Sequence, residues 1–203
     1  MNPPFSKWKL LAMIAGTVLV ADQVTKYLAV AHLTWAFETA HAQSLGEKVS
    51  AFLTVKDPQE RGPVRVIDQV WQHRYAENRG AAWGIFNNAA EKFRVPFFYL
   101  VSIGAVIFIF AYYRKLSINQ RYLQIALALV LGGALGNALD RVVRGYVIDF
   151  IDWHWFDPNW MRPGRHWPTF NVADSGISTG LVLLFLEMLL VKKPAAQTTK
   201  KVA

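Results

Sequence analysis

Long apolar segments with almost no charge are the feature that most constrains how this chain of 203 residues can fold. Residues 95–113 contain no charged side chain, and neither do residues 122–139. A helix needs about 20 mainly apolar residues to cross the hydrocarbon core of a bilayer, and both segments are close to that length. Two further apolar segments each carry only a few charges. The sequence therefore predicts a mainly α-helical membrane protein with four transmembrane helices, at about residues 10–33, 95–113, 122–143 and 174–191.

Composition supports this class and excludes others. The chain is 53% hydrophobic and only 18% charged, and it contains no cysteine. Thiol catalysis, disulfides and thiolate zinc sites are therefore excluded. The net charge of +8 is divided between the chain ends and the loops, without a dense basic patch, so we expect no nucleic-acid partner.

The first apolar segment also resembles a cleavable signal peptide, because two lysines precede it and small residues follow it. However, Asp22, Gln23 and Lys26 lie between the apolar run and the potential cleavage site, where neutral residues are expected. We therefore expect an uncleaved first helix.

The basic residues near the span ends predict the orientation of the chain in the membrane. Lys/Arg residues are enriched in short cytoplasmic loops and flanks. With four spans, three basic groups fall on one side: Lys7 and Lys9, then Arg114, Lys115 and Arg121, and finally the four lysines of the tail 192–203. We therefore expect both termini to be cytoplasmic, and residues 34–94 and 144–173 to lie outside the cytoplasm, within one domain formed by residues 1–203.

The two outer segments show different patterns. Residues 64–71 partly alternate between polar and apolar, as in a half-buried strand, and residues 78–80 read as a turn. The second segment contains four of the eight tryptophans, namely Trp153, Trp155, Trp160 and Trp167. Tryptophan concentrates at the membrane–water boundary, so we expect this segment to lie on the outer leaflet.

Five polar residues next to the spans are the candidates for chemistry: Asn137, Asp140, Asp149, Asn171 and Asp174. A carboxylate at the bilayer centre costs about 2.5–3.5 kcal/mol on insertion scales, so it persists where it is paired, hydrated or functional. We expect Asp149 and Asp174 to lie at the same surface of the membrane, on its non-cytoplasmic side. Two carboxyls at one level suggest aspartic-protease chemistry, in which one accepts a proton from water and the other polarises a carbonyl.

Structural interpretations of the same residues remain open. Asp140 and Arg141 could form an ion pair that anchors a helix end. Asn171 and Asp174 fit a variant of the capping box at the start of the fourth span. Gly132 and Gly136 form a GxxxG step, which allows a neighbouring helix to approach closely.

Other catalytic schemes have less support. Ser175 or Ser178 could pair with Lys26, but no spacing brings them together. The five histidines show no ligand spacing, and His154 reads as an interfacial residue, so we expect neither a metal site nor a cofactor.

Four motifs in this order resemble the lipoprotein signal peptidases, the type II signal peptidases of bacteria. DQVTKYL begins at Asp22, and ENRGAAWGIF contains Asn78 and Gly80, with Trp83 at the usual phenylalanine position. GGALGNALDR is followed by GYVIDF, and FNVADSGISTG is the fourth. The first outer loop, around residues 37–63, and the segment 153–167 are both longer than is usual in that family.

This resemblance implies an intramembrane aspartic endopeptidase of the bacterial inner membrane. It would cleave a prolipoprotein before its diacylglyceryl-modified cysteine, with Asp149 and Asp174 as the catalytic pair near the outer face. It also implies an outer β-structured cradle, a helical segment on the membrane surface, lipid contacts and a monomeric chain. The residues implied to bind substrate or shape the site are Asp22, Lys26, Asn78, Gly80, Gly133, Asn137, Asp140, Arg141, Asn171 and Ala173.

The alternative function is a small ion-coupled transporter or channel that uses its buried carboxylates as a relay. Asp140, Asp149 and Asp174 group at one face of the membrane, whereas a relay needs steps across its whole thickness. The grouping therefore favours the peptidase.

Overall fold

The fold was obtained as a computed structural model that describes residues 6–80, 91–154 and 166–190. Three predicted features fall at least partly outside these ranges. They are residues 81–86 of the second motif, the tail 192–203, and tryptophans 155 and 160 of the outer-leaflet segment. Between the third and fourth long helices, the described residues contain no membrane-surface helix.

Four long helices correspond to the four predicted spans: α1 (Lys7–Leu33), α4 (Glu91–Lys115), α5 (Arg121–Arg144) and α6 (Val172–Leu190). Ser6 caps the start of α1 by accepting a hydrogen bond from the Lys9 N–H at 3.3 Å. Gly145 ends α5 in the left-handed conformation, with φ of 85°. Within the described ranges, α1, α5 and α6 are long and apolar enough to cross a membrane.

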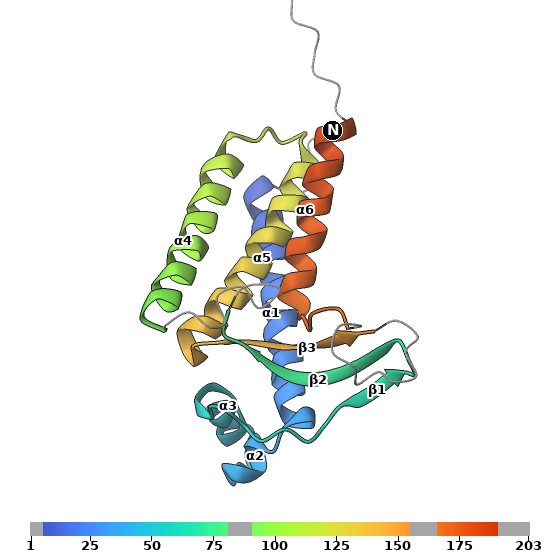
Figure 1. The fold of residues 1–203 in the computed structure, drawn as a ribbon. Helices are drawn as coiled ribbons and strands as arrows, with labels where there is room; N and C mark the ends of the chain where they lie inside the picture. Colours follow the sequence, from blue (N-terminus) through green and yellow to red (C-terminus); the bar gives the residue numbers. More distant parts are fainter. Residues whose placement is uncertain (1–5, 81–90, 155–165, 191–203) are drawn as a thin grey trace, which may run out of the picture.

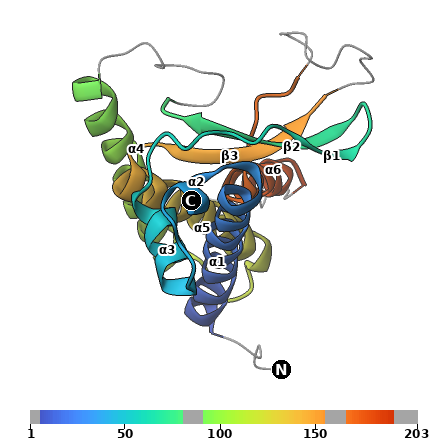
Figure 2. The same cartoon turned by 90° about the horizontal axis from the view of Figure 1, so that it is seen from below.

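Helix α5 lies at the centre of the bundle and contacts α1, α4 and α6 (Figures 1 and 2). Its glycines allow close contacts on two sides. A Cβ atom at Gly132 would lie 2.8 Å from the Ala15 carbonyl oxygen of α1, and one at Gly133 would lie 2.2 Å from the Ala173 carbonyl oxygen of α6. The predicted close approach at the GxxxG step is therefore confirmed.

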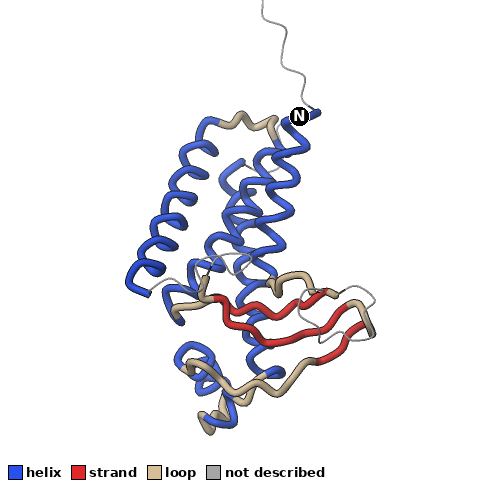
Figure 3. The backbone as a smooth tube through the Cα atoms, in the orientation of Figure 1, coloured by secondary structure: helices blue, strands red, loops and turns tan. Residues whose placement is uncertain are grey.

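A three-stranded antiparallel sheet lies at one end of the bundle (Figures 1 and 3). Its strands are β1 (Val64–Ile67), β2 (Trp71–Asn78) and β3 (Val147–Trp153), in that order. The predicted strand at 64–71 is in fact β1, a turn and the first residue of β2. Strand β3 was not predicted, and its pairing of Asp149 with Ala76 places a candidate catalytic residue in the sheet.

Two short helices occupy the long segment between α1 and β1: α2 (Ala36–Thr39) and α3 (Leu45–Thr54). Neither was predicted. Ser44 and Glu47 form a complete capping box at the start of α3. Phe52 of α3 packs with Val30 of α1 and Ile148 of β3 in one buried apolar cluster. The long loop is therefore an integral part of the core beneath the sheet.

The opposite end of the bundle holds the start of α1, the α4–α5 connection and the end of α6 (Figure 1). The Lys7 ammonium group donates hydrogen bonds to the carbonyl oxygens of Arg114 and Leu116, both at 2.8 Å. Lys7 thus satisfies carbonyl groups exposed at the end of α4.

Candidate active site

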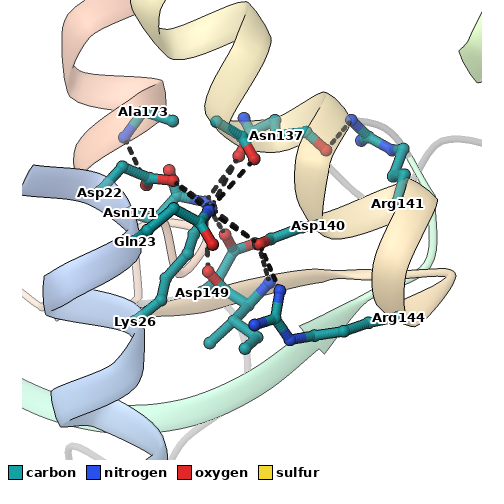
Figure 4. A network of polar contacts seen from close by, with 12 residues as sticks. Asp22, Gln23, Lys26, Asn137, Asp140, Arg141, Arg144, Asp149, Asn171 and Ala173 are labelled. Carbon is teal, nitrogen blue, oxygen red and sulfur yellow. Dashed lines mark hydrogen bonds and ion pairs between the residues drawn. The ribbon is translucent and has the colours of Figure 1, made fainter. Parts of the chain in front are cut away.

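The polar residues singled out in the sequence come together where α1, α5, α6 and β3 meet (Figure 4). Helix α1 carries Asp22 and Lys26, and α5 carries Asn137, Asp140 and Arg141. Strand β3 carries Asp149. The start of α6 supplies Asn171, Ala173 and Asp174.

Four buried charges form the inner part of this assembly. Lys26 contacts the carboxylates of Asp22 and Asp140, both at 2.8 Å, and Arg144 contacts Asp140 at 2.8 Å. Their side chains are at most 1% exposed. Two positive and two negative charges balance one another, which is the condition under which ionised groups can be buried.

The same cluster fixes the backbone of two other elements. The Asp22 carboxylate accepts the Ala173 N–H at 2.9 Å, at the start of α6. The Asp140 carboxylate accepts the Ile148 N–H at 3.1 Å, in β3 next to Asp149. The buried charges therefore set the positions of the two elements that carry Asp149 and Asp174.

Asp149 is a buried carboxyl held by two amide donors. Asn171 Nδ2 donates to Oδ1 at 2.6 Å, and Asn78 Nδ2 donates to Oδ2 at 3.1 Å. Asp149 is only 2% exposed. Burial, and after it the nearby Asp174 carboxyl, raise the pKa of Asp149 to about 7.

Asp174 caps α6 and faces the same site. Its N–H donates to Asn171 Oδ1 at 2.9 Å, and its Oδ2 accepts the Asn171 N–H at 3.3 Å, which completes the predicted reciprocal capping box. Its Oδ1 accepts a hydrogen bond from Asn137 Nδ2 at 2.7 Å. Capping and a place at the site are therefore compatible for both Asn171 and Asp174.

An open pocket of about 750 Å³ lies beside the two carboxyls. Asp149 and Asp174 both line it, together with Asn137 and Arg141 of α5. Aromatic and aliphatic side chains form other parts of its wall: Val147, Trp153, Trp167, Phe170 and Ile177. Such a pocket offers apolar contact area next to paired carboxyls that can activate water.

The alternative of an ion pair between Asp140 and Arg141 is not what the structure shows. Asp140 pairs with Lys26 and Arg144 instead, because residues four apart lie on the same helix face. Arg141 donates to the carbonyl oxygen of Gly80 at 3.3 Å and lines the pocket.

Gly80 and Gly133 contribute to the site in different ways. The Gly80 N–H donates to Asn78 Oδ1 at 3.1 Å, which closes the predicted turn and orients the Asn78 amide toward Asp149. Gly133 allows α5 to contact the first turn of α6, since no side chain would fit against the Ala173 carbonyl.

Sequence reasoning missed the contributions of Gln23 and Arg144. Gln23 Nε2 donates to the carboxylates of Asp22 and Asp140, both at 3.1 Å. The signals were present in the sequence: an amide next to Asp22 inside an apolar span, and a base four residues after Asp140.

A serine–lysine dyad does not form among the described residues. Lys26 contacts Asp22, Asp140 and Asn137, whereas Ser175 Oγ donates to the Asn171 carbonyl at 3.0 Å. His154, which the sequence predicts to be interfacial, is buried within the protein at the end of the sheet.

Comparisons with known proteins agree with one another. The family model described as "Signal peptidase (SPase) II" matches residues 14–190. A protein named lipoprotein signal peptidase, from Anaeromyxobacter sp. (strain Fw109-5), is 56% identical over 185 residues, which is 90% of this chain and 86% of that protein. One of the same name from Bacillus subtilis (strain 168) is 36% identical over 181 residues, which is 89% of this chain and 94% of that protein.

Solved structures show a similar fold. Two structures described as a bacterial membrane enzyme are each 29% identical to this chain, with TM-scores of 0.63 and 0.62. The first match covers 95% of this chain and 94% of the solved one, and the second covers 90% and 94%.

Proposed function

The chain belongs to the signal peptidase II family, and from that premise we propose that it is an aspartic endopeptidase that removes the signal peptide from prolipoproteins. One observation carries the assignment of the chemistry. Asp149 and Asp174 line the same pocket, and the single side chain of Asn171 contacts both of them. We assign the catalytic step to this pair.

The proposed reaction needs one proton shared between the two carboxyls. The ionised carboxylate takes a proton from water as the water attacks the scissile carbonyl, and the protonated carboxyl donates a hydrogen bond to the carbonyl oxygen. The proton taken from water then passes to the amine nitrogen as the C–N bond breaks. Asn78, Asn137 and Asn171 supply fixed donors around the pair. These donors hold both carboxyls in place without adding a competing charge.

The scaffold roles follow from the contacts. Asp22, Lys26 and Asp140 position the strand and helix that carry the catalytic pair. Gly80 positions Asn78, Gly133 admits the first turn of α6, and the Ala173 N–H anchors that turn on Asp22. Arg141 lines the pocket and brings a positive charge to the substrate side.

The substrate is proposed to enter from the membrane. A lipid-modified cysteine would place its acyl chains among apolar groups, and each buried CH₂ contributes about 0.8 kcal/mol. The apolar wall of the pocket, with Trp153, Phe170 and Ile177, matches such a ligand. Surrounding phospholipid then contacts the exposed apolar faces of the helices.

We also propose an orientation for this integral membrane protein. Helix α4 is the second of four spans in chain order, in addition to α1, α5 and α6, and both termini face the cytoplasm of a bacterium with the protein in its inner membrane. The sheet with α2 and α3 then forms a cradle on the outer side, with the active site near the outer face. The basic residues at the bundle end opposite the sheet support this orientation. The unit proposed to act is a monomer.

The function is tested with purified protein in detergent and a lipidated prolipoprotein, by following the loss of the signal peptide. Asp149→Asn and Asp174→Asn should each lower the cleavage rate at least about 100-fold, the usual scale for loss of a general acid or base. Asp68→Asn is a matched control, because the Asp68 side chain is 80% exposed on the β1–β2 turn. Full cleavage by either active-site variant refutes the proposed pair.

The transporter alternative receives no support from the geometry. Asp22, Asp140 and Asp149 belong to one connected network (Figure 4), which Asp174 joins through its N–H bond to Asn171. The network lies at the sheet end of the bundle rather than in steps across it. Cation flux through liposomes, together with no cleavage by the wild type, would reverse this conclusion.

A further inference from the structure

A second cluster of polar side chains lies on the other face of the strand that carries Asp149. Alternate residues of a strand point to opposite faces. Asp149 and Trp153 line the pocket, so Asp152 and His154 point away from it. His166 pairs with His154 through an antiparallel bridge, which places it beside them.

The three side chains converge on one small volume. One ligand-capable atom from each of Asp152, His154 and His166 lies within 4.8 Å of the other two. His166 Nδ1 is 2.8 Å from Asp152 Oδ1, and the two imidazole centroids are 5.1 Å apart. Asp152 and His154 are buried, whereas the His166 side chain is 21% exposed and gives access from solvent.

We propose that Asp152, His154 and His166 form a binding site for a divalent transition-metal ion, best matched by Zn²⁺. Imidazole nitrogen and carboxylate oxygen are ordinary ligands of Zn²⁺ at about 2.0–2.2 Å. In a tetrahedral site with these bond lengths the ligand atoms lie about 3.4 Å apart, so side-chain movements that shorten the longest separation by up to about 1.4 Å close the set. Three protein ligands leave a fourth position for water. Mg²⁺ and Ca²⁺, which select oxygen ligands, fit this donor set poorly.

A surrounding layer of contacts already orients the carboxylate. Gln72 Nε2 donates to Asp152 Oδ2 at 2.6 Å, which leaves Oδ1 directed at His166. Ligating carboxylates are commonly held in this way by a second hydrogen-bonding residue. The Arg74 Nε lies 3.7 Å from Asp152 Oδ2, and its positive charge opposes an added cation. Because its side chain is about half exposed, solvent screens this repulsion.

The site is adjacent in sequence to the wall of the active-site pocket. Trp153 and Trp167 line the pocket, and each is the neighbour of a proposed ligand. The Trp167 N–H donates to the Trp153 carbonyl at 2.8 Å. An ion that joins His154 to His166 therefore fixes the relative positions of two pocket-wall residues without touching the substrate.

The test measures metal binding directly and does not require peptidase activity. Purified full-length protein in detergent is stripped with a chelator and titrated with ZnCl₂ by calorimetry, and with Co²⁺ by visible absorption. The Asp149→Asn variant serves as a second background, so that a failure of the proposed peptidase chemistry does not affect the result. We expect one ion per chain, and a Co²⁺ spectrum typical of four-coordinate nitrogen and oxygen ligation.

Variants separate this site from adventitious binding. His154→Ala and His166→Gln should each weaken binding at least about tenfold, and Gln72→Ala should weaken it about 10–100-fold through the orientation of Asp152. His41→Ala, at an exposed histidine elsewhere, should bind like the wild type. His166→Gln tests the idea even if the buried His154→Ala variant fails to fold. Wild-type uptake no greater than that of His166→Gln, or no uptake at all, overturns the proposal.

Discussion

Replacing Asp149 by asparagine should stabilise the protein at neutral and alkaline pH while it removes activity. The carboxyl has a pKa of about 7 in the folded chain, against about 3.9 in an unfolded one. Between these values the folded protein holds a proton that the unfolded chain has lost, so folding is favoured at low pH. This stabilisation is fully present below about pH 4 and is lost as the pH rises to about 7.

The magnitude follows from the size of the shift. Each unit of pKa difference corresponds to about 1.36 kcal/mol, so the two units between about pH 5 and pH 7 correspond to roughly 3 kcal/mol. Asparagine does not titrate and escapes this loss. It cannot accept hydrogen bonds from both Asn78 and Asn171, which costs about 1 kcal/mol at every pH. Relative to wild type, Asp149→Asn therefore gains roughly 3 kcal/mol between about pH 5 and pH 8.

Thermal unfolding followed by tryptophan fluorescence in detergent measures this gain. A change of roughly 3 kcal/mol corresponds to a relative rise in Tm of about 6–12 °C between the two pH values. The exposed Asp68→Asn should show no such rise. If the Tm curves of Asp149→Asn and wild type run parallel from about pH 5 to pH 8, the reasoning from burial to a raised pKa is refuted.

Three further outcomes are expected. Gly133→Ala, whose Cβ would lie 2.2 Å from a carbonyl oxygen of α6, should displace the start of that helix and lower the cleavage rate, whereas Gly104→Ala, with nothing within 4 Å, should cleave normally. Lys26→Met leaves buried carboxylates uncompensated and should destabilise the fold by about 3–5 kcal/mol in thermal unfolding, unlike the exposed Lys56→Met. Because the pKa of Asp149 is about 7, the dyad loses its shared proton above that pH, and cleavage should fall about tenfold per pH unit there; a rate that stays flat to about pH 9 contradicts this.

The helical bundle could be predicted from the sequence because the length of an apolar segment is a local property of the chain. Each predicted span corresponds to a helix, with ends shifted by a few residues. Strand β3 was not accessible, since it is defined by pairing with β2, about 70 residues earlier in the chain. Helices α2 and α3 were also missed, although the Ser44–Glu47 capping box was a readable signal.

The sequence predicted which residues form the site better than it predicted which of them contact one another. The motif resemblance selected the residues that the fold brings together, but it did not give their partners. Arg144 rather than Arg141 pairs with Asp140, because residues four apart lie on the same face of a helix and adjacent residues do not. Capping and function were weighed as alternatives for Asn171, yet one amide group serves both, its oxygen toward α6 and its nitrogen toward Asp149. Only three-dimensional geometry shows that the two roles use different atoms.

The contact between Arg144 and Phe52 couples the long segment between α1 and β1 to the buried charges, and this coupling restricts how related sequences can change. The Arg144 guanidinium lies 3.9 Å from the centroid of the Phe52 ring and donates to the Phe52 carbonyl at 3.2 Å, while its other end neutralises Asp140. One of the four buried charges thus depends on α3, a helix in the long segment between α1 and β1. A relative without this helix must supply another support for this arginine or dispense with it. The helix and the arginine should therefore covary, and transplanting one without the other into a relative that lacks both should fail.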